Sequence, residues 1–293
     1  MHEMQIILNT VLGVLLVLLP VGIVLAVMIR KRKEQRAASR APFDGLTRRP
    51  AGEALRIKLE ELDDKLSDLA FGLVILPVLL TVGLIFLHPA SIIGALVFFV
   101  YSTVSSVYYG RKSYKAICLR AKYRLGYEGE RFVGEAISRL IYHAFEIYHD
   151  VPFETFNLDH VMVGPRGVFV VETKTRSMPV KENGKKEYRV QFDGKCLKWP
   201  NWKTDNESIE QAKRNAATLS VYLSPAIGKK IWVTPIVTAP GWTVELLVPC
   251  DNIYVLNTGQ IYDFCSSQPE RLTGEQIANI CHQLDQKCRL PLK

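Results

Sequence analysis

Three long apolar runs lie in the first 109 residues of this 293-residue chain and constrain its fold more than any other feature. The first run covers about residues 5–29 and is followed directly by Arg30, Lys31, Arg32 and Lys33. About 20 apolar residues suffice to cross a bilayer as a helix, and positive residues mark the cytoplasmic end of a span. The pattern therefore predicts a retained transmembrane helix that ends in the cytoplasm.

The second and third runs, about residues 69–87 and 90–109, meet at His88-Pro89. Because proline breaks helices, we expect a tight turn between two helices there. Basic residues flank the pair on both sides, which places both ends in the cytoplasm. The expected membrane anchor covers residues 1–119, with three spans and a cytoplasmic helical linker at 30–68. A re-entrant or purely buried helical pair is the alternative for the second and third runs.

The chain carries a net charge of +8, which favours an anionic partner. Lipid headgroups and nucleic acid both qualify, and the basic residues beside the apolar runs are explained by topology and by anionic lipid at the cytoplasmic face. The expected location is the cell (inner) membrane, multi-pass, with the C-terminal domain in the cytoplasm. No apolar run contains an Asp, Glu, Lys or Arg in its interior, so nothing marks the ion path of a channel or transporter.

From about residue 120 onward the pattern becomes typical of an α/β domain. Thr273 is expected to cap the last helix, with Gln276 completing the capping box. Helical spacing occurs at 129–144, 206–223 and 273–288, and strand-like runs occur at 145–153, 159–163, 167–174, 230–240 and 252–264.

Charged side chains interrupt two of the apolar strands, where they are unfavourable unless paired or bound to a metal. The stretch "VGPRGV" indicates a turn between these strands. If Gly164 faces Gly167 across the turn, then Asp159 faces Glu172, because directly opposed residues share one face of an antiparallel pair. Lys174 lies on the same face, since side chains alternate along a strand.

Two opposed carboxylates repel each other unless a positive charge lies between them. A hard divalent cation fits, because it prefers carboxylate oxygens. Lys174 beside such a metal could orient or deprotonate an attacking water, or neutralise charge on a scissile phosphate. The alternative is an ordinary salt-bridge cluster at an exposed hairpin end. The residues alone leave both interpretations open.

The order of these motifs resembles that of a known family. "YEGERFVGEAISRL", "YHDVPF" and "LDHVMVGPRGVFVVETKT" together resemble the nuclease-related domain called NERD, of the PD-(D/E)XK nuclease superfamily. The resemblance runs from about Gly126 to Ala217. It implies a restriction-endonuclease-like α/β fold, a mixed sheet flanked by helices, over a cytoplasmic domain at residues 120–293.

The resemblance also implies roles for five residues. Glu130, Asp159 and Glu172 match positions that bind magnesium or manganese, and Lys174 matches the catalytic lysine. Gln211 matches a glutamine that lines the same site. Three departures concern substrate contacts more than metal binding: Leu158 replaces the motif's nominal proline, Asn215 stands where some relatives have an aromatic residue, and the usual Asn and Gly after the Glu-x-Lys are missing.

The expected function is that of a membrane-anchored, metal-dependent nuclease that hydrolyses phosphodiester bonds, in DNA rather than RNA. The alternative is a non-catalytic, membrane-tethered module that binds nucleic acid or a protein partner, because fold does not determine function. His160 should face away from the site and serve packing or hydrogen bonding.

A basic segment follows the Glu-x-Lys and would suit a phosphate backbone, although a solvated loop explains it as well. Two tryptophans beside it, Trp199 and Trp202, could stack on unpaired bases or cover a core edge. The basic residues are Lys181, Lys185, Lys186, Arg189, Lys195 and Lys198.

Overall fold

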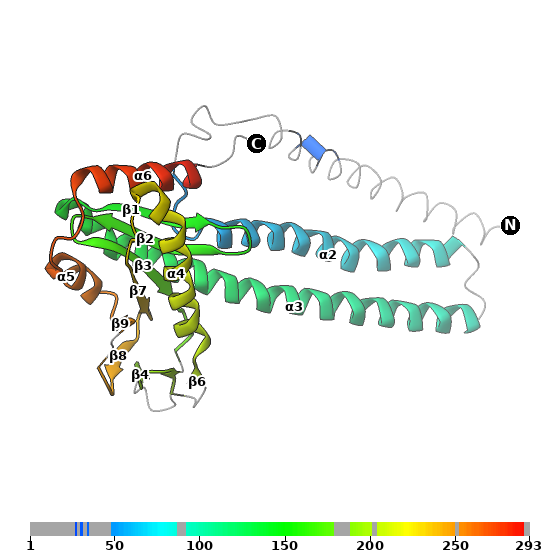
Figure 1. Cartoon of the computed structure of the whole chain (residues 1–293). Coiled ribbons are helices and arrows are strands. Elements are labelled where there is room, and N and C mark those ends of the chain that lie inside the picture. The colour runs from blue at the N-terminus through cyan, green and yellow to red at the C-terminus, as the bar shows by residue number, and fades with distance from the viewer. Residues whose placement is uncertain are drawn as a thin grey trace. The chain divides into compact units, whose positions relative to one another are not determined.

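The computed structural model divides into two compact units (Figure 1). The first takes in residues 60–121, and the second takes in residues 45–59 together with 122–293. The structure describes residues 48–86, 92–178, 188–200, 204–249 and 252–289, together with Val27, Arg30, Lys31 and Glu34.

Two long helices supply the first unit: α2 (Glu53–Phe86) and α3 (Ile92–Ser138). They lie side by side in this unit, where a Cβ on Gly72 would come within 2.9 Å of the Tyr109 ring. The helices cover nearly all of the second and third predicted spans. In the part of the chain that the structure describes, however, no helix is long and apolar enough to cross a membrane.

The three predicted spans are therefore not supported by the structure. Both helices join an apolar segment to a charged one, as in the continuation of α3 through Arg111, Lys112 and Lys115. The first predicted span, residues 5–29, lies outside the described residues except for Val27, and so does the predicted turn at His88-Pro89.

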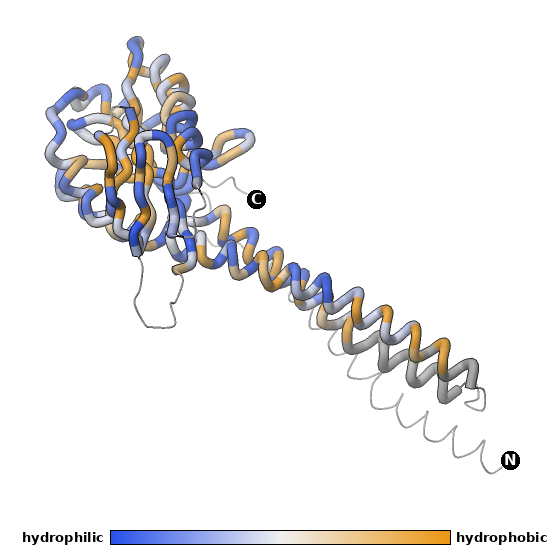
Figure 2. Tube along the Cα trace, turned by 90° about the horizontal axis from the view of Figure 1, so that it is seen from below, coloured by the Kyte–Doolittle hydropathy of each residue, from blue (hydrophilic) through white to orange (hydrophobic). Residues whose placement is uncertain are grey.

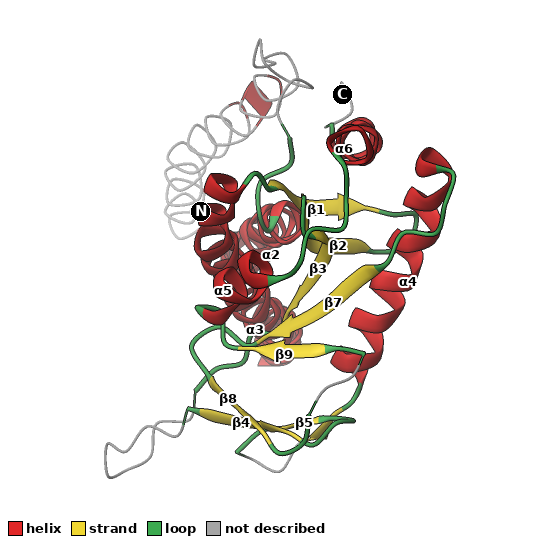
Figure 3. Cartoon of the chain, turned by 60° about the vertical axis from the view of Figure 1, so that its left-hand side comes forward, coloured by secondary structure: helices red, strands yellow, loops and turns green. Residues whose placement is uncertain are grey.

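A five-stranded mixed sheet forms the centre of the second unit (Figure 3). The first three strands in its order pair antiparallel, and the last three pair parallel. Parallel strands need coverage on both faces, which explains their continuous apolar character. The order is β1 (Glu146–Pro152), β2 (Asn157–Gly164), β3 (Gly167–Thr173), β7 (Val233–Thr238) and β9 (Tyr254–Leu256).

The β2–β3 hairpin has the predicted register. Gly164 pairs with Gly167, and the ladder continues to His160 opposite Val171. Gly167 has φ +133°, a conformation that favours glycine. A Cβ on Gly164 would lie 2.6 Å from the Phe145 ring, so this position also requires glycine. The turn chemistry thus sets the register of the whole hairpin.

Helices cover both faces of the sheet, as predicted. On one face, α4 (Glu207–Ile227) and α6 (Gly274–Cys288) bury Leu219, Leu223 and Leu284 against the strands. On the other, the end of α3 and α5 (Gln260–Ser267) bury Ile137 and Ile261. The strands are accordingly hydrophobic in Figure 2. The capping box of α6 between Thr273 and Gln276 is confirmed.

A smaller four-stranded sheet completes the second unit. Its core contains Trp199 and Trp242, whose rings meet edge to face at 5.0 Å. Trp199 is only 5% exposed, so it covers a core and does not stack on bases. The strand order is β6 (Thr204–Asp205), β5 (Leu197–Lys198), β4 (Arg189–Phe192) and β8 (Thr243–Leu246).

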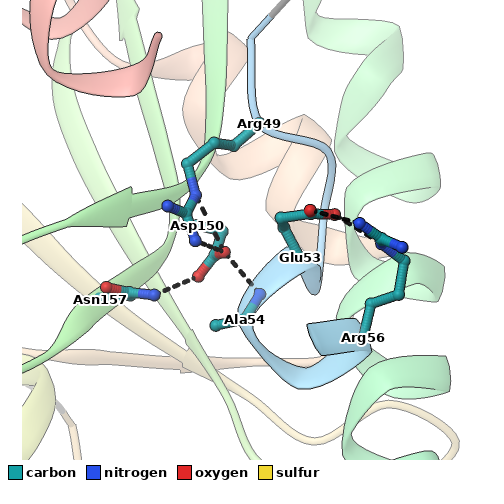
Figure 4. A network of polar contacts seen from close by, with 6 residues as sticks. All are labelled: Arg49, Glu53, Ala54, Arg56, Asp150 and Asn157. Atoms are coloured by element: carbon teal, nitrogen blue, oxygen red, sulfur yellow. Dashed lines mark hydrogen bonds and ion pairs between the residues drawn. The ribbon is translucent and has the colours of Figure 1, made fainter. Parts of the chain in front are cut away.

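The chain before α2 packs onto the central sheet within the second unit (Figure 4). Asp150 of β1 has φ +49° and is skipped by the β1–β2 ladder. Its Oδ2 accepts hydrogen bonds from the Arg49 guanidinium, at 2.7 Å from NH2, and from the Ala54 N–H at 2.7 Å. Asn157 donates to its Oδ1 at 2.7 Å. Asp150 therefore ties the start of α2 to the sheet; the predicted domain of residues 120–293 does not include this segment.

Candidate active site

The open end of the β2–β3 hairpin holds the two predicted central carboxylates. One step beyond the last paired residues, the register brings Asp159 opposite Glu172. The Thr173 N–H donates to Asp159 Oδ2 at 2.7 Å, and Glu172 is 3% exposed. Two carboxylates are therefore held close together on strands that are otherwise apolar.

Lys174 lies between the sheet and α4. Its backbone N–H donates to the Thr238 carbonyl at 2.9 Å, which continues the pairing of β3 with β7. Its Nζ lies 3.1 Å from Glu172 Oε1 and donates to Gln211 Oε1, also at 3.1 Å. The predicted association of Glu172, Lys174 and Gln211 is thus present in the structure.

Glu130 reaches the site from α3. The preceding Gly129 packs so closely on the chain after β3 that a Cβ there would lie 2.1 Å from Thr175 Oγ1. This close approach explains why a glycine precedes the glutamate. Burial raises the pKa of Glu130 to about 8, and the charges of Asp150 and Glu172 add to the effect.

The pKa shifts at the site reflect several buried acidic groups that lie near one another. Burial raises the pKa of Asp159, and the nearby Glu172 and Glu130 raise it further. Burial also raises the pKa of Glu172, against the opposing effects of Lys174 and Asn215. Burial lowers the pKa of Lys174, but Glu172 and Asp159 outweigh it, so the net shift is upward. Lys174 thus opposes the carboxylates of all three acidic residues, and Lys58 also acts on Glu130.

Asn215 is a site residue that sequence reasoning did not assign. It is buried on α4, one turn after Gln211, and donates from Nδ2 to Glu172 Oε2 at 2.9 Å. Its spacing of four residues from Gln211, on the same helix face, was the available signal. Asn215 and Lys174 together hold the two oxygens of Glu172.

Asp205 was also missed. It accepts hydrogen bonds from the Ser208 N–H and hydroxyl in the first turn of α4, at 3.0 and 2.8 Å, and pairs with Arg176 at 3.1 Å. Asp205 therefore fixes the start of the helix that carries Gln211 and Asn215.

The donor chemistry of the site fits a hard divalent cation. Carboxylate oxygens are the ligands that magnesium and manganese prefer. Negative charge on one of these carboxylates also makes ionisation of its neighbours less favourable, and a bound cation would offset that effect. In the ranges that the structure describes, no three Asp, Glu, His or Cys side chains lie close enough together to form a metal-binding group. Magnesium, however, often takes only one or two protein carboxylates.

His160 faces away from the carboxylates, as predicted. It is buried, and its Nδ1 lies 2.8 Å from Nδ1 of His149 on the paired strand. Burial lowers the pKa of His149 to about 4, and that of His160 is lowered by burial and by His149. Both rings therefore stay neutral and serve packing.

The predicted basic segment is only partly described. Arg189, Lys195 and Lys198 are exposed, and Lys198 pairs with Asp193 at 2.9 Å. The remaining predicted members Lys181, Lys185, Lys186 and Trp202 lie outside the described residues.

Comparison with known proteins gives one family match, over part of the chain. No curated protein matches the chain. Among solved structures, SfsA of Pyrococcus furiosus in complex with Ca2+ is 13% identical, with a TM-score of 0.20. That match covers 55% of this chain and 52% of SfsA, so the chain spans about half the length of the solved protein. Residues 125–240 match the family described as NERD, the nuclease-related domain, and this stretch contains Glu130, Asp159, Glu172, Lys174 and Gln211.

Proposed function

We propose that this protein hydrolyses phosphodiester bonds in nucleic acid, DNA before RNA, with the help of a divalent metal. The observation that carries the proposal is that the hairpin register sets Asp159 opposite Glu172, with Lys174 Nζ 3.1 Å from Glu172 Oε1 and with Glu130 near enough to raise the pKa of Asp159. Buried charges of this kind are unfavourable in a purely structural role, and strongly perturbed carboxyl groups concentrate at functional sites.

Glu130, Asp159 and Glu172 would hold magnesium or manganese. An ion held by these residues would supply Lewis-acid chemistry: a bound water of lowered pKa and polarisation of the phosphate. The charge of the ion would also relieve the repulsion that raises the pKa values of Glu130 and Asp159.

Lys174 would act as a fixed positive charge. Glu172 and Asp159 raise its pKa, which favours the protonated ammonium. It can orient the attacking water and neutralise charge that develops on the phosphate. Gln211 and Glu172 position its Nζ, and Asn215 positions Glu172.

The test uses the full chain with supercoiled DNA, linear DNA and RNA, in magnesium, manganese or EDTA. Asp159→Ala and Lys174→Ala are compared with the parent and with Glu135→Ala, a matched control because Glu135 is exposed on the same helix as Glu130. Metal-dependent cutting by the parent and the control, lost in both site variants, is the expected result.

One observation favours a second candidate, a nucleic-acid-binding module without catalysis. Glu172 is already paired with Lys174, and no group of three potential ligands is preassembled among the described residues. No cutting under any metal, with DNA binding unchanged in Asp159→Ala, would overturn the enzyme and leave this module.

The proposal includes membrane attachment, which rests on the sequence alone. The apolar runs at 5–29, 69–87 and 90–109 and their basic flanks support it. The full chain should stay with the membrane fraction after alkaline carbonate extraction. Release into the supernatant would contradict attachment by spans.

A further inference from the structure

A basic pocket lies at the end of the central sheet opposite the carboxylates. Its volume is about 180 Å3, and it lies where β3 and β7 begin. Arg166 comes from the hairpin turn, Lys229 and Lys230 from the chain before β7, and Arg271 from the chain before α6. Trp232 stands beside them, 59% exposed. Residues far apart in the sequence thus place four cations around one small pocket.

Backbone contacts hold the rim of this pocket in place. The Pro165 carbonyl accepts from the N–H groups of Arg271 and Leu272, at 2.8 and 3.0 Å. On the opposite side, the Ile231 N–H donates to Ser224 Oγ of α4 at 3.0 Å. The cations therefore project from an anchored framework, which reduces the entropy lost on binding a ligand.

The charge of the pocket is uncompensated. Among the described residues that line it none is acidic, and the printed side-chain partner of Arg166 is a backbone carbonyl, that of Gln268, to which its guanidinium donates. Glu270 precedes Arg271 in the chain but is absent from the lining. Four like charges around one pocket repel each other and attract an anionic ligand.

A second pocket of about 340 Å3 adjoins the first. The two share Lys230 and Trp232, and the second is also lined by Lys213 and Val221 of α4. An exposed indole can stack on any nucleobase. A site for a phosphate therefore lies next to a flat ring and a larger, more apolar pocket.

We propose that this surface binds the phosphate backbone of a nucleic-acid strand, with an adjacent base against Trp232. The first pocket is smaller than the roughly 300 Å3 expected for a complete small-molecule site, so it suits one phosphate of a longer chain. A recessed pocket also fits a bilayer surface poorly, because lipid headgroups present a broad plane. The inference rests on the proposed function, whose substrate it extends.

The spacing within β3 predicts a length requirement. Gly167 lines the pocket and Glu172 lies five residues further along the strand, a separation of roughly 17 Å. A duplex strand carries one phosphate about every 3.4 Å. A duplex substrate must therefore exceed about five base pairs to contact the carboxylates and this pocket together.

The first experiment measures how salt weakens binding of the full chain to a labelled 20-nucleotide strand and duplex in EDTA. Lys229→Gln/Lys230→Gln is compared with Lys65→Gln/Lys122→Gln, a control with the same charge change at exposed lysines elsewhere. Neither pocket lysine has a described ion pair, so the fold should survive. The slope of log affinity against log salt should fall by about 1 in the pocket variant only, as expected when the contact with one phosphate is lost.

The second experiment separates base stacking from charge. Trp232→Ala should weaken binding of the 20-nucleotide single strand about tenfold and leave the salt slope unchanged.

Equal salt slopes in the pocket and control variants would overturn the inference. Loss of binding to phosphatidylglycerol vesicles, with nucleic-acid binding intact, would also overturn it and assign the surface to lipid. Failure of the proposed function can be told apart from failure of this inference. If the parent does not cut but the salt slope still falls in the lysine double variant, the pocket inference stands. If the parent cuts but the pocket and control variants have equal salt slopes, the nuclease activity is supported and the pocket inference is wrong.

Discussion

The two ends of β3 carry opposite charges and are built in opposite ways. At its C-terminal end, Glu172 and Lys174 are partly or fully buried and are placed by strand register and by α4. At its start, Arg166 and Lys230 are placed by a turn and a loop, nearer to solvent. Charges in the buried end interact strongly and shift each other's pKa, whereas solvent screens those at the exposed end. The difference suggests chemistry at one end and binding at the other.

Replacing one lysine at each end should sharpen this comparison most. Lys174→Gln removes the ammonium that lies 3.1 Å from Glu172 and should lower the cutting rate at least 100-fold, in the range for loss of one positioned catalytic group. Lys230→Gln should leave the rate at saturating DNA unchanged and weaken binding only a few-fold. Steady-state cleavage across DNA concentrations checks both, and equal rate losses in both variants would break the comparison.

Removing the paired carboxylate near the acidic end should destabilise the second unit. The side chain of Asp150 is 4% exposed and pairs with Arg49, so Asp150→Ala leaves a buried guanidinium uncompensated. We expect a loss of about 3 kcal/mol in the free energy of unfolding. Urea denaturation measures it, with Glu270→Ala as the exposed control, which should change stability by less than about 0.5 kcal/mol.

Asn215→Leu should have a smaller effect on stability at the same end. It removes the hydrogen bond to Glu172 Oε2 with little change in volume. A hydrogen bond to a charged group contributes about 2 kcal/mol, which should be lost at pH 8. Denaturation at pH 8 checks this. An unchanged unfolding free energy, with cutting also unchanged, would remove Asn215 from the site.

The metal-free protein should become more stable as pH falls from 8 to 6.5. The folded state holds the Glu130 proton up to a pKa of about 8, while the unfolded state releases it near pH 4.5. Protonation of Glu130 therefore raises the free energy of unfolding by about 1.5 kcal/mol between pH 8 and pH 6.5. This stabilisation is lost as pH rises through 8. Thermal unfolding in EDTA measures it, and Glu130→Gln should reduce the dependence, leaving the part that comes from the raised pKa values of Asp159 and Glu172. The lowered pKa of His149, to about 4, acts in the opposite direction only below pH 6.5.

The acidic end could be predicted from sequence because burial makes its charges conspicuous. Asp159 and Glu172 interrupt strands that are otherwise apolar, and the glycines of the turn set their register. No such contrast marks Asn215, a polar residue on an amphipathic helix whose contact with Glu172 depends on how α4 lies on the sheet. Side-chain alternation shows which face a residue occupies but not which helix covers it.

The basic end could not be predicted for a related reason. Arg166, Lys230 and Arg271 lie in three separate connecting segments, and only the folded chain brings them together. The role of Arg49 was likewise hidden, because its partner Asp150 lies 101 residues later. Local periodicity carries information over one element, whereas these groupings depend on tertiary packing.

The contact between Arg49 and Asp150 has a consequence for the time course of biosynthesis. Ribosomes add about 5–20 residues per second, so Arg49 emerges roughly 5–20 s before its partner. During that interval the segment before α2 has no sheet on which to dock. The second unit can therefore complete its folding only after β1 has been synthesised, although the segment before α2 is made much earlier. Any delay in translation between residues 60 and 145 prolongs the exposure of that segment.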